Sequence, residues 1–257
     1  MNQVFDSYAQ YYDLLYQDKN YVAEVEYIVS HIRVHTPKAK HILELGCGTG
    51  AHAEHLARMG YTVHGIDMSE KMLARAEVRK EGLPADVAAR LSFSLGDVRS
   101  VRTNDTYDVV TSLFHVMSYQ STNDDLAAAF ETAAAHLLPG GLFLYDFWYG
   151  PAVLTQQPDT RVKRLESSEI KVTRIAEPKM HVNENIVDVN YDVFIEQKET
   201  DEITQVQENH KMRYIFLTEL EYFHNKKVWS DYRAYEWLET TLLSEKSWSG
   251  FVVSIHK

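Results

Sequence analysis

The sequence HILELGCGTG, residues His41 to Gly50, decides the class of fold. Its first half is a short apolar run, typical of a strand buried in a parallel sheet, and its second half is a glycine-rich turn. A helical stretch over His52–Met59 and a second short strand over Tyr61–Ile66 follow, and this strand ends on Asp67. Strand, glycine turn, helix, strand and acid is the order of a nucleoside-binding site at the edge of a parallel sheet.

The glycine spacing and two acidic residues indicate which ligand binds there. The turn reads G-C-G-T-G, whereas dinucleotide sites space their glycines G-x-G-x-x-G. Glu44, two residues before the first glycine, would repel a pyrophosphate but would attract a cationic amino-acid group. Asp67 is placed to accept hydrogen bonds from both ribose hydroxyls. S-adenosylmethionine (SAM) has a ribose, a cationic amino-acid end and no phosphate, so we expect SAM rather than NAD.

Three segments resemble motifs of the class I SAM-dependent methyltransferases. E-L-G-C-G-T-G resembles motif I, G-I-D-M-S over residues 65–69 resembles motif II, and L-L-P-G-G-L is typical of the region before their fifth strand. The resemblance implies an α/β fold with a Rossmann-like sheet and a SAM site at its carboxyl edge. The residues that we expect to bind the cofactor are Tyr12, Tyr21, Glu44, Gly46, Cys47, Gly48, Gly50, Asp67, Met68, Asp97, Val98 and Leu113.

Some of these positions have particular roles. Asp97 follows the expected third strand, Leu91–Leu95, and is placed to accept from the adenine amino group, while the backbone N–H of the next residue reads a ring nitrogen. Cys47 is the one cysteine of the chain, and its small side chain fits the glycine turn as a packing residue. With no second cysteine there is no internal disulfide, which favours a reducing compartment.

Composition agrees with a single enzyme that acts on a small molecule. The 257 residues suffice for one large α/β domain or for one domain with an insertion. The formal net charge of -11 argues against a nucleic-acid substrate, although a local Arg or Lys can still bind a small anion. The first residues, MNQVFDSYAQYYD, lack the basic and apolar regions of a signal peptide. We therefore expect a cytoplasmic protein.

The sequence pattern divides the chain into four segments. Residues 1–37 form an N-terminal arm, rich in tyrosines such as Tyr8, and a helix; residues 38–150 form the SAM-binding core. Residues 151–215 alternate apolar and polar side chains, which indicates an inserted antiparallel sheet. Residues 216–257 supply a helix, with Thr218 as its N-cap, and a hairpin that completes the core sheet. The tyrosines of the arm either cover apolar surface or form a lid over the cofactor.

The segment after the expected fourth strand carries candidates for the acceptor side. His115 and Tyr119 follow that strand at the edge where ligands bind in open α/β sheets. His115 is therefore a candidate base. His52 and His55 fall on an expected helix away from this edge, and we interpret them as part of a solvated helix face.

Two interpretations stay open for the segment E-N-H-K-M-R-Y. Glu208, His210 and Arg213 form either a polar cluster at the acceptor or the solvated face of an alternating strand. The histidines of the chain are scattered, and no obvious cluster of metal ligands appears.

Longer stretches resemble the N,N-dimethyltransferases of nucleotide-linked amino sugars. These stretches are YYDLLYQDKNYVAE, HILELGCGTGAH, SLFHVMSY and YDFWYGP. The resemblance implies that Tyr16 lies at the acceptor sugar, Tyr21 at the amino-acid end of SAM, Trp148 and Tyr149 on the acceptor side, and Arg174 near the nucleotide. It also implies dimers that pair through the inserted sheet, and catalysis mainly by approximation of the two substrates.

The chain departs from that family in two places. The family carries small residues where His115 and Met117 stand, and an arginine near the C-terminus where Trp248 and Ser249 stand. The resemblance implies that this arginine recognises phosphate. Its replacement therefore counts against a nucleotide-linked acceptor.

The best hypothesis is N-methylation of a nucleotide-linked amino sugar, with His115 and Tyr16 as candidate catalytic residues. One alternative is O-methylation of a small metabolite, with His115 as the base. Another is a SAM-binding or NAD-binding module without catalysis. The residues that we expect to bind the acceptor are Tyr16, Tyr119, Trp148, Tyr149, Arg174, His210 and Arg213.

Overall fold

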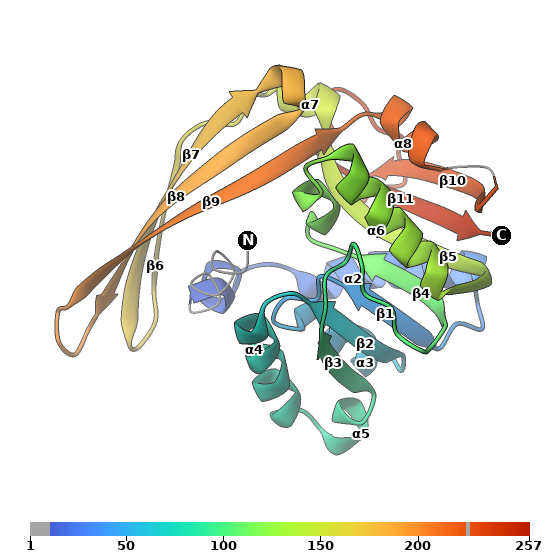
Figure 1. Ribbon diagram of the computed structural model, residues 1–257. Helices are drawn as coiled ribbons and strands as arrows, with labels where there is room; N and C mark the ends of the chain where they lie inside the picture. Colours follow the sequence, from blue (N-terminus) through green and yellow to red (C-terminus); the bar gives the residue numbers. More distant parts are fainter. Residues whose placement is uncertain (1–10, 225–226) are drawn as a thin grey trace.

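The computed structural model describes residues 11–224 and 227–257, so residues 1–10 of the expected arm, Tyr8 included, lie outside the described residues. The core sheet consists of β1 (His41–Leu45), β2 (Thr62–Asp67), β3 (Leu91–Leu95), β4 (Tyr107–Ser112), β5 (Leu137–Tyr149), β10 (Trp229–Glu236) and β11 (Ser249–His256). Its strand order is β3-β2-β1-β4-β5, continued by β11 and β10 beyond β5 (Figure 1). The first five strands are parallel and the last two are antiparallel, which confirms the Rossmann-like sheet.

Helices cover both faces of this sheet. They are α2 (Tyr21–His35), α3 (Ala51–Arg58), α4 (Glu70–Glu81), α5 (Ala85–Ala88), α6 (Asn123–His136), α7 (Gly150–Thr155) and α8 (Leu217–Phe223), with the short 3-10 helices η1 (Val116–Tyr119) and η2 (Val182–Glu184). Apolar residues of α2 and α3 pack on one face and those of α6 and α8 on the other. Strand β1 serves both layers because successive side chains point to opposite faces, Ile42 to the first and Leu43 to the second.

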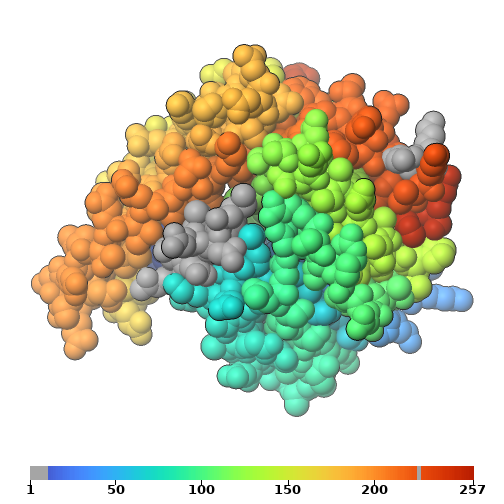
Figure 2. All heavy atoms as spheres, viewed as in Figure 1, coloured from blue at the N-terminus to red at the C-terminus, as the bar shows by residue number. Residues whose placement is uncertain are grey.

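The expected inserted sheet forms an extension to the core. It consists of β6 (Arg161–Glu166), β7 (Ile170–His181), β8 (Ile186–Gln197) and β9 (Ile203–Ile215), paired antiparallel in that order. A short parallel pairing of β5 with β9, Trp148 with Tyr214 and Tyr149 with Ile215, joins the extension to the core. In Figures 1 and 2 the extension, coloured yellow to orange, arches away beside the core. Among the described helices there is no apolar stretch of the length that a membrane span requires.

Two local predictions were wrong. Helix α8 begins at Leu217, with Phe216 rather than Thr218 as its N-cap. Glu219 explains the shift, because its Oε2 accepts from the backbone N–H of Phe216 at 2.8 Å. Strand β5 begins at Leu137, within the L-L-P-G-G-L segment that we expected to precede it, because Leu137 pairs with Tyr107 across a register shift.

Gly65, in the middle of β2, is required by close packing. A β-carbon there would lie 2.7 Å from Phe93 Cδ1 and 2.8 Å from Cys47 Sγ. Gly65→Ala should therefore lower the free energy of unfolding by about 1–3 kcal/mol. The measurement is urea denaturation of both proteins. Gly82→Ala is the matched control, because its β-carbon would meet nothing closer than 3.4 Å and its φ of -78° suits alanine. Equal effects of the two substitutions would contradict the packing argument.

Candidate functional site

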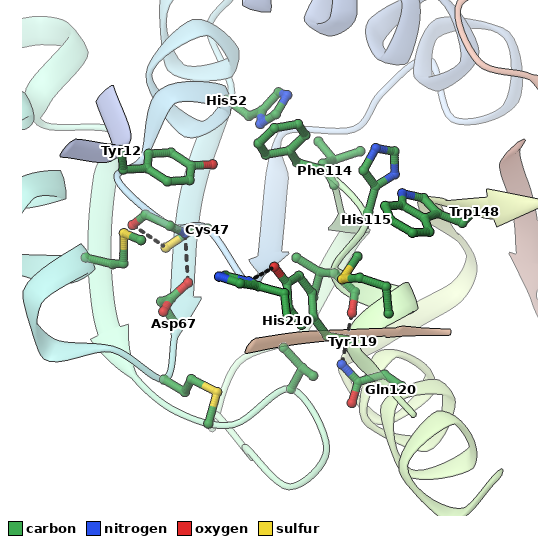
Figure 3. A pocket seen from close by; sticks show the side chains of 18 of the residues that line it. Tyr12, Cys47, His52, Asp67, Phe114, His115, Tyr119, Gln120, Trp148 and His210 are labelled. Carbon is green, nitrogen blue, oxygen red and sulfur yellow. Dashed lines mark hydrogen bonds between the residues drawn. The ribbon is translucent and has the colours of Figure 1, made fainter. Parts of the chain in front are cut away.

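A cavity of about 360 Å³ lies at the carboxyl edge of the core strands and reaches the extension (Figure 3). Its wall includes the following residues that the sequence singled out: Tyr12, Tyr16, Gly46, Cys47, Gly48, Asp67, Met68, Asp97, Val98, Leu113, His115, Tyr119, Trp148 and His210. The cavity therefore brings residues of the core and of the extension together in one site.

The glycine turn after β1 is tied to the end of β2. The backbone N–H groups of Gly46 and Cys47 donate to Ile66 O at 2.7 and 2.9 Å, and that of Gly48 donates to Asp67 Oδ2 at 2.8 Å. Gly48 has a φ of +54°, and a β-carbon there would meet no atom within 4 Å. The space beside the Asp67 carboxylate is thus open to a ligand. Gly50 lies outside the cavity wall, where it is the N-cap of α3 with a left-handed φ of +76°.

Glu44 is not part of the cavity wall. Its side chain is only 1% exposed, and burial together with the nearby Asp67 carboxylate raises the pKa of Glu44 to about 8. Its Oε1 lies 3.8 Å from Nδ1 of His52, and its buried Oε2 has no hydrogen-bond partner among the described residues. Glu44 thus lies outside the cavity wall, and its contact with the cofactor stays a prediction.

His52 was wrongly assigned to a solvated helix face. It lies in the first turn of α3, is buried, and lines the cavity. Its Nε2 pairs with Glu24 Oε2 at 2.7 Å, and the ring of Tyr21 packs edge-on at 4.9 Å. Tyr21 itself is not part of the cavity wall. Burial lowers the pKa of His52, while Glu24 opposes that change.

Arg99 is a wall residue that the sequence analysis missed. Its Nε donates to Asp97 Oδ1 at 2.9 Å, and its Nη1 donates to Asp125 Oδ1 at 2.8 Å. The hydrogen bonds from Arg99 lower the pKa of Asp97 and so favour its charged form. The sequence signal that could have identified Arg99 is its position two residues after the acid Asp97.

The N-terminal arm, here residues 11–20, bridges the two sides of the cavity. Tyr11 donates to Glu208 Oε2 of the extension at 2.7 Å, and Asp13 accepts from Thr49 Oγ1 of the core at 2.8 Å. Between these anchors Tyr12 and Tyr16 lie in the cavity wall, with their ring centroids 4.8 Å apart. This arrangement supports the interpretation of the arm as a lid.

The part of the cavity where we expected the acceptor is built from aromatic and polar side chains (Figure 3). The phenol of Tyr119 lies 2.7 Å from His210 Nδ1, and His210 Nε2 lies 3.2 Å from Glu208 Oε2. The ring of Trp148 packs against the rings of His115 and Trp248, with centroid distances of 6.1 and 5.9 Å respectively. Glu208 and His210 are buried, so they belong to a polar cluster and not to a solvated strand face.

Three expected acceptor residues lie outside the cavity wall. Tyr149 points into the core, because alternation along β5 places Trp148 on the cavity side. Arg213 is buried against Glu219 Oε1 at 2.6 Å, where it stabilises the start of α8. Arg174 packs over the ring of the wall residue Tyr191, with its Cζ 4.6 Å from the ring centroid.

Other wall residues were not predicted individually. They are Met72, Phe114, Val116, Gln120, Val189, Tyr191, Met212 and Trp248. Val189 and Tyr191 share one face of β8, and two-residue alternation was the signal that could have identified them. Among the described residues no group of three or more His, Cys, Asp or Glu could hold a metal ion.

Comparison with known proteins shows the family. A model of a methyltransferase domain matches residues 42–141. The dTDP-3-amino-3,6-dideoxy-alpha-D-glucopyranose N,N-dimethyltransferase of Streptomyces fradiae is 31% identical over 185 residues, 71% of this chain and 69% of that protein. The chain belongs to the class I SAM-dependent methyltransferases.

Two further comparisons agree with this membership. The dTDP-3-amino-3,4,6-trideoxy-alpha-D-glucopyranose N,N-dimethyltransferase of Streptomyces venezuelae is 35% identical over 146 residues, which span 56% of this chain and only 58% of that protein. The crystal structure of Streptomyces venezuelae DesVI has a TM-score of 0.79 and 23% identity, and the match covers 96% of this chain and 98% of that chain. At this identity the structural match shows the fold.

SAM fits the residues on the core side of this methyltransferase. The open space beside Gly48 and the carboxylate of Asp67 suit the ribose, and Asp97 and Val98 suit the adenine. Tyr12 and the glycine turn are left for the methionine part. Carboxylates that accept charge-assisted hydrogen bonds suit the hydroxyl and amino groups of such a nucleoside.

Asp67→Asn should weaken SAM binding. The substitution removes a charged acceptor of ribose hydroxyls, which costs about 1–3 kcal/mol of binding free energy. Calorimetric titration with SAM and S-adenosylhomocysteine measures the change. Asp86→Asn is the control, because its side chain is 73% exposed on α5. Unchanged affinity in Asp67→Asn, with an unchanged melting temperature, would mean that Asp67 does not bind the ribose.

Glu44→Gln should make stability less dependent on pH. The pKa of Glu44 is about 8 in the folded protein against an ordinary 4.5, so the folded state binds the proton more tightly. Stability therefore falls as the pH rises from 4.5 towards 8, and glutamine removes this loss. Urea midpoints of both proteins at pH 6 and pH 8 measure the effect, with the variant gaining more at pH 8. Equal changes of the urea midpoint between pH 6 and pH 8 in the two proteins would contradict the raised pKa of Glu44.

Proposed function

We propose that this methyltransferase transfers the methyl group of SAM to the amino group of a nucleotide-linked amino sugar. The observation that carries the proposal is the continuity of the cavity from Asp67 on the core to Tyr191 and His210 on the extension. A cofactor on the core side and a small acceptor on the extension side would meet at Phe114 and His115. The names of the Streptomyces relatives, which are amino-sugar N,N-dimethyltransferases, supply the acceptor class.

Approximation is the main source of rate in this proposal. SAM supplies a methyl group already activated by its sulfonium; the amine lone pair forms the new N–C bond, and the C–S electron pair stays on sulfur. The chain orients the acceptor between aromatic walls and keeps water away from it. Tyr16 and Phe114, whose rings meet edge-on at 4.8 Å, and Trp148 form these walls. Holding two reactants in line contributes much of the rate in such reactions.

O-methylation of a small metabolite is the second candidate. A hydroxyl acceptor usually requires a base, and the position of His115 in the cavity wall beside Asp146 favours this alternative.

Pairing of two copies through the extension stays a prediction from family resemblance.

A matched set of acceptors tests the proposal. The purified protein is incubated with SAM and with dTDP-3-amino-3,6-dideoxyglucose, with its 3-hydroxy counterpart, or with the amino sugar lacking dTDP. Mass spectrometry should show gains of one or two methyl groups on the nucleotide-linked amine alone. Methylation of the hydroxyl compound alone would favour the second candidate, and methylation of the free amino sugar alone would exclude the nucleotide from the acceptor.

A further inference from the structure

We infer that Asp146 and His115 form a dyad that removes a proton from the acceptor ammonium, with His115 as the base and Asp146 as its positioning residue. This inference rests on the proposed N-methylation and names the group that prepares the amine. An amine that is bound as its ammonium ion has no lone pair, so it must lose a proton before it accepts a methyl group.

The backbone holds His115 in a rare conformation. Phe114 and His115 have φ values of 63° and 65°, so two consecutive residues other than glycine are left-handed. Each such residue costs about 1–3 kcal/mol and persists only where its surroundings enforce it. Asp146 supplies that enforcement, because its carboxylate accepts from the backbone N–H of His115 at 2.9 and 3.1 Å. Strain of this kind gathers at functional sites.

The same carboxylate orients the imidazole. Asp146 is 1% exposed, and its Oδ2 lies 2.7 Å from Nδ1 of His115. The two atoms lie within ion-pair distance, but their arrangement does not meet the geometry of an aligned hydrogen bond. A lone pair on Nδ1 would be repelled by the carboxylate, so the proton of the neutral ring belongs on Nδ1 and the lone pair on Nε2. Asp146 also stabilises the imidazolium that forms when Nε2 takes a proton.

The other histidines of the cavity wall are engaged differently. His52 is bound through Nε2 by Glu24, with Nδ1 facing Glu44, and His210 is bound through Nδ1 by Tyr119 and through Nε2 by Glu208. Their side chains are 7% and 2% exposed, against 22% for His115. For His115 the described residues offer a partner to Nδ1 alone. Its Nε2 is therefore the imidazole nitrogen that remains for an acceptor.

The proton step balances without another reactant. The N–H bond of the acceptor ammonium breaks, its electron pair stays on the amine nitrogen, and the proton bonds to His115 Nε2. The imidazolium then returns its proton to solvent, through the partly exposed edge of the ring, before a second methylation. Other titratable groups near the dyad are His52 on α3, and Lys19 and Tyr16 of the arm, which contact the ring of Phe114.

Nitrogen NMR of the histidine side chains tests the geometry without any acceptor or cofactor. Long-range ¹H–¹⁵N spectra of the full-length protein, assigned by comparison with His115→Asn, report which ring nitrogen carries the proton. We expect the Nδ1–H tautomer at His115 in the wild type, and a mixture of tautomers in Asp146→Asn. An Nε2–H tautomer in the wild type would overturn the proposal.

The pH profile of methylation separates a base from a structural residue. With dTDP-3-amino-3,6-dideoxyglucose and SAM, His115→Asn should lower kcat/KM by roughly 10²–10⁴-fold below the pKa of the acceptor amine. The loss should shrink above that pKa, where the amine arrives neutral. Asparagine is chosen because it tolerates the left-handed conformation. His41→Asn, at an exposed position that begins β1, is the matched control and should leave the profile unchanged.

The remaining outcomes are distinguishable. An equal loss at every pH would assign His115 a structural role and overturn the dyad, as would no loss. If the wild type methylates only hydroxyl acceptors, the proposed N-methylation fails instead. The tautomer measurement stands apart from that failure because it uses no acceptor.

Discussion

The carboxylate of Asp67 is the constraint on which the cofactor side depends. One oxygen accepts from Gly48 N at 2.8 Å and the other from Ser69 N at 2.9 Å, so a single side chain fixes both the turn after β1 and the start of α4. Burial raises the pKa of Asp67, and these backbone N–H groups oppose that rise by stabilising the charge. The turn itself requires glycine, since Gly46 and Gly50 have φ values of 77° and 76°. Turn and carboxylate are thus formed together.

Strand β5 positions residues of the part of the cavity that we propose for the acceptor, as Asp67 fixes the turn on the cofactor side. It pairs with β4 on one edge, with β11 on the other, and at its last two residues with β9 of the extension. Alternation along the strand sends Phe147 and Tyr149 into the core, whereas Asp146 and Trp148 lie on the opposite face, where the cavity forms. The same strand therefore anchors the extension and supplies residues of the part of the cavity that we propose for the acceptor.

The sequence predicted those parts of the site that depend on local patterns. Motif spacing identified the glycine turn and Asp67, because their geometry is set by neighbours along the chain. His52 was misassigned because helical periodicity does not reveal that Glu24, 28 residues away in the sequence, covers it. Arg213 lies outside the cavity wall for a similar reason, since its partner Glu219 caps a helix that follows the strand. Contacts between elements decide both cases, and no local pattern encodes them.

Charge explains why an N-methylating site would place a base beside an otherwise aromatic wall. Both SAM and an ammonium acceptor are cations, and two positive charges brought to reacting distance repel each other strongly in a cavity of low dielectric constant. The carboxylate of Asp67 in the cavity wall and that of Asp146, which contacts the wall residue His115, offset part of that repulsion. They also stabilise the ammonium form, which does not react. Removal of its proton by His115 ends the repulsion and exposes the lone pair in one step, so the aromatic walls then only have to hold the amine in line.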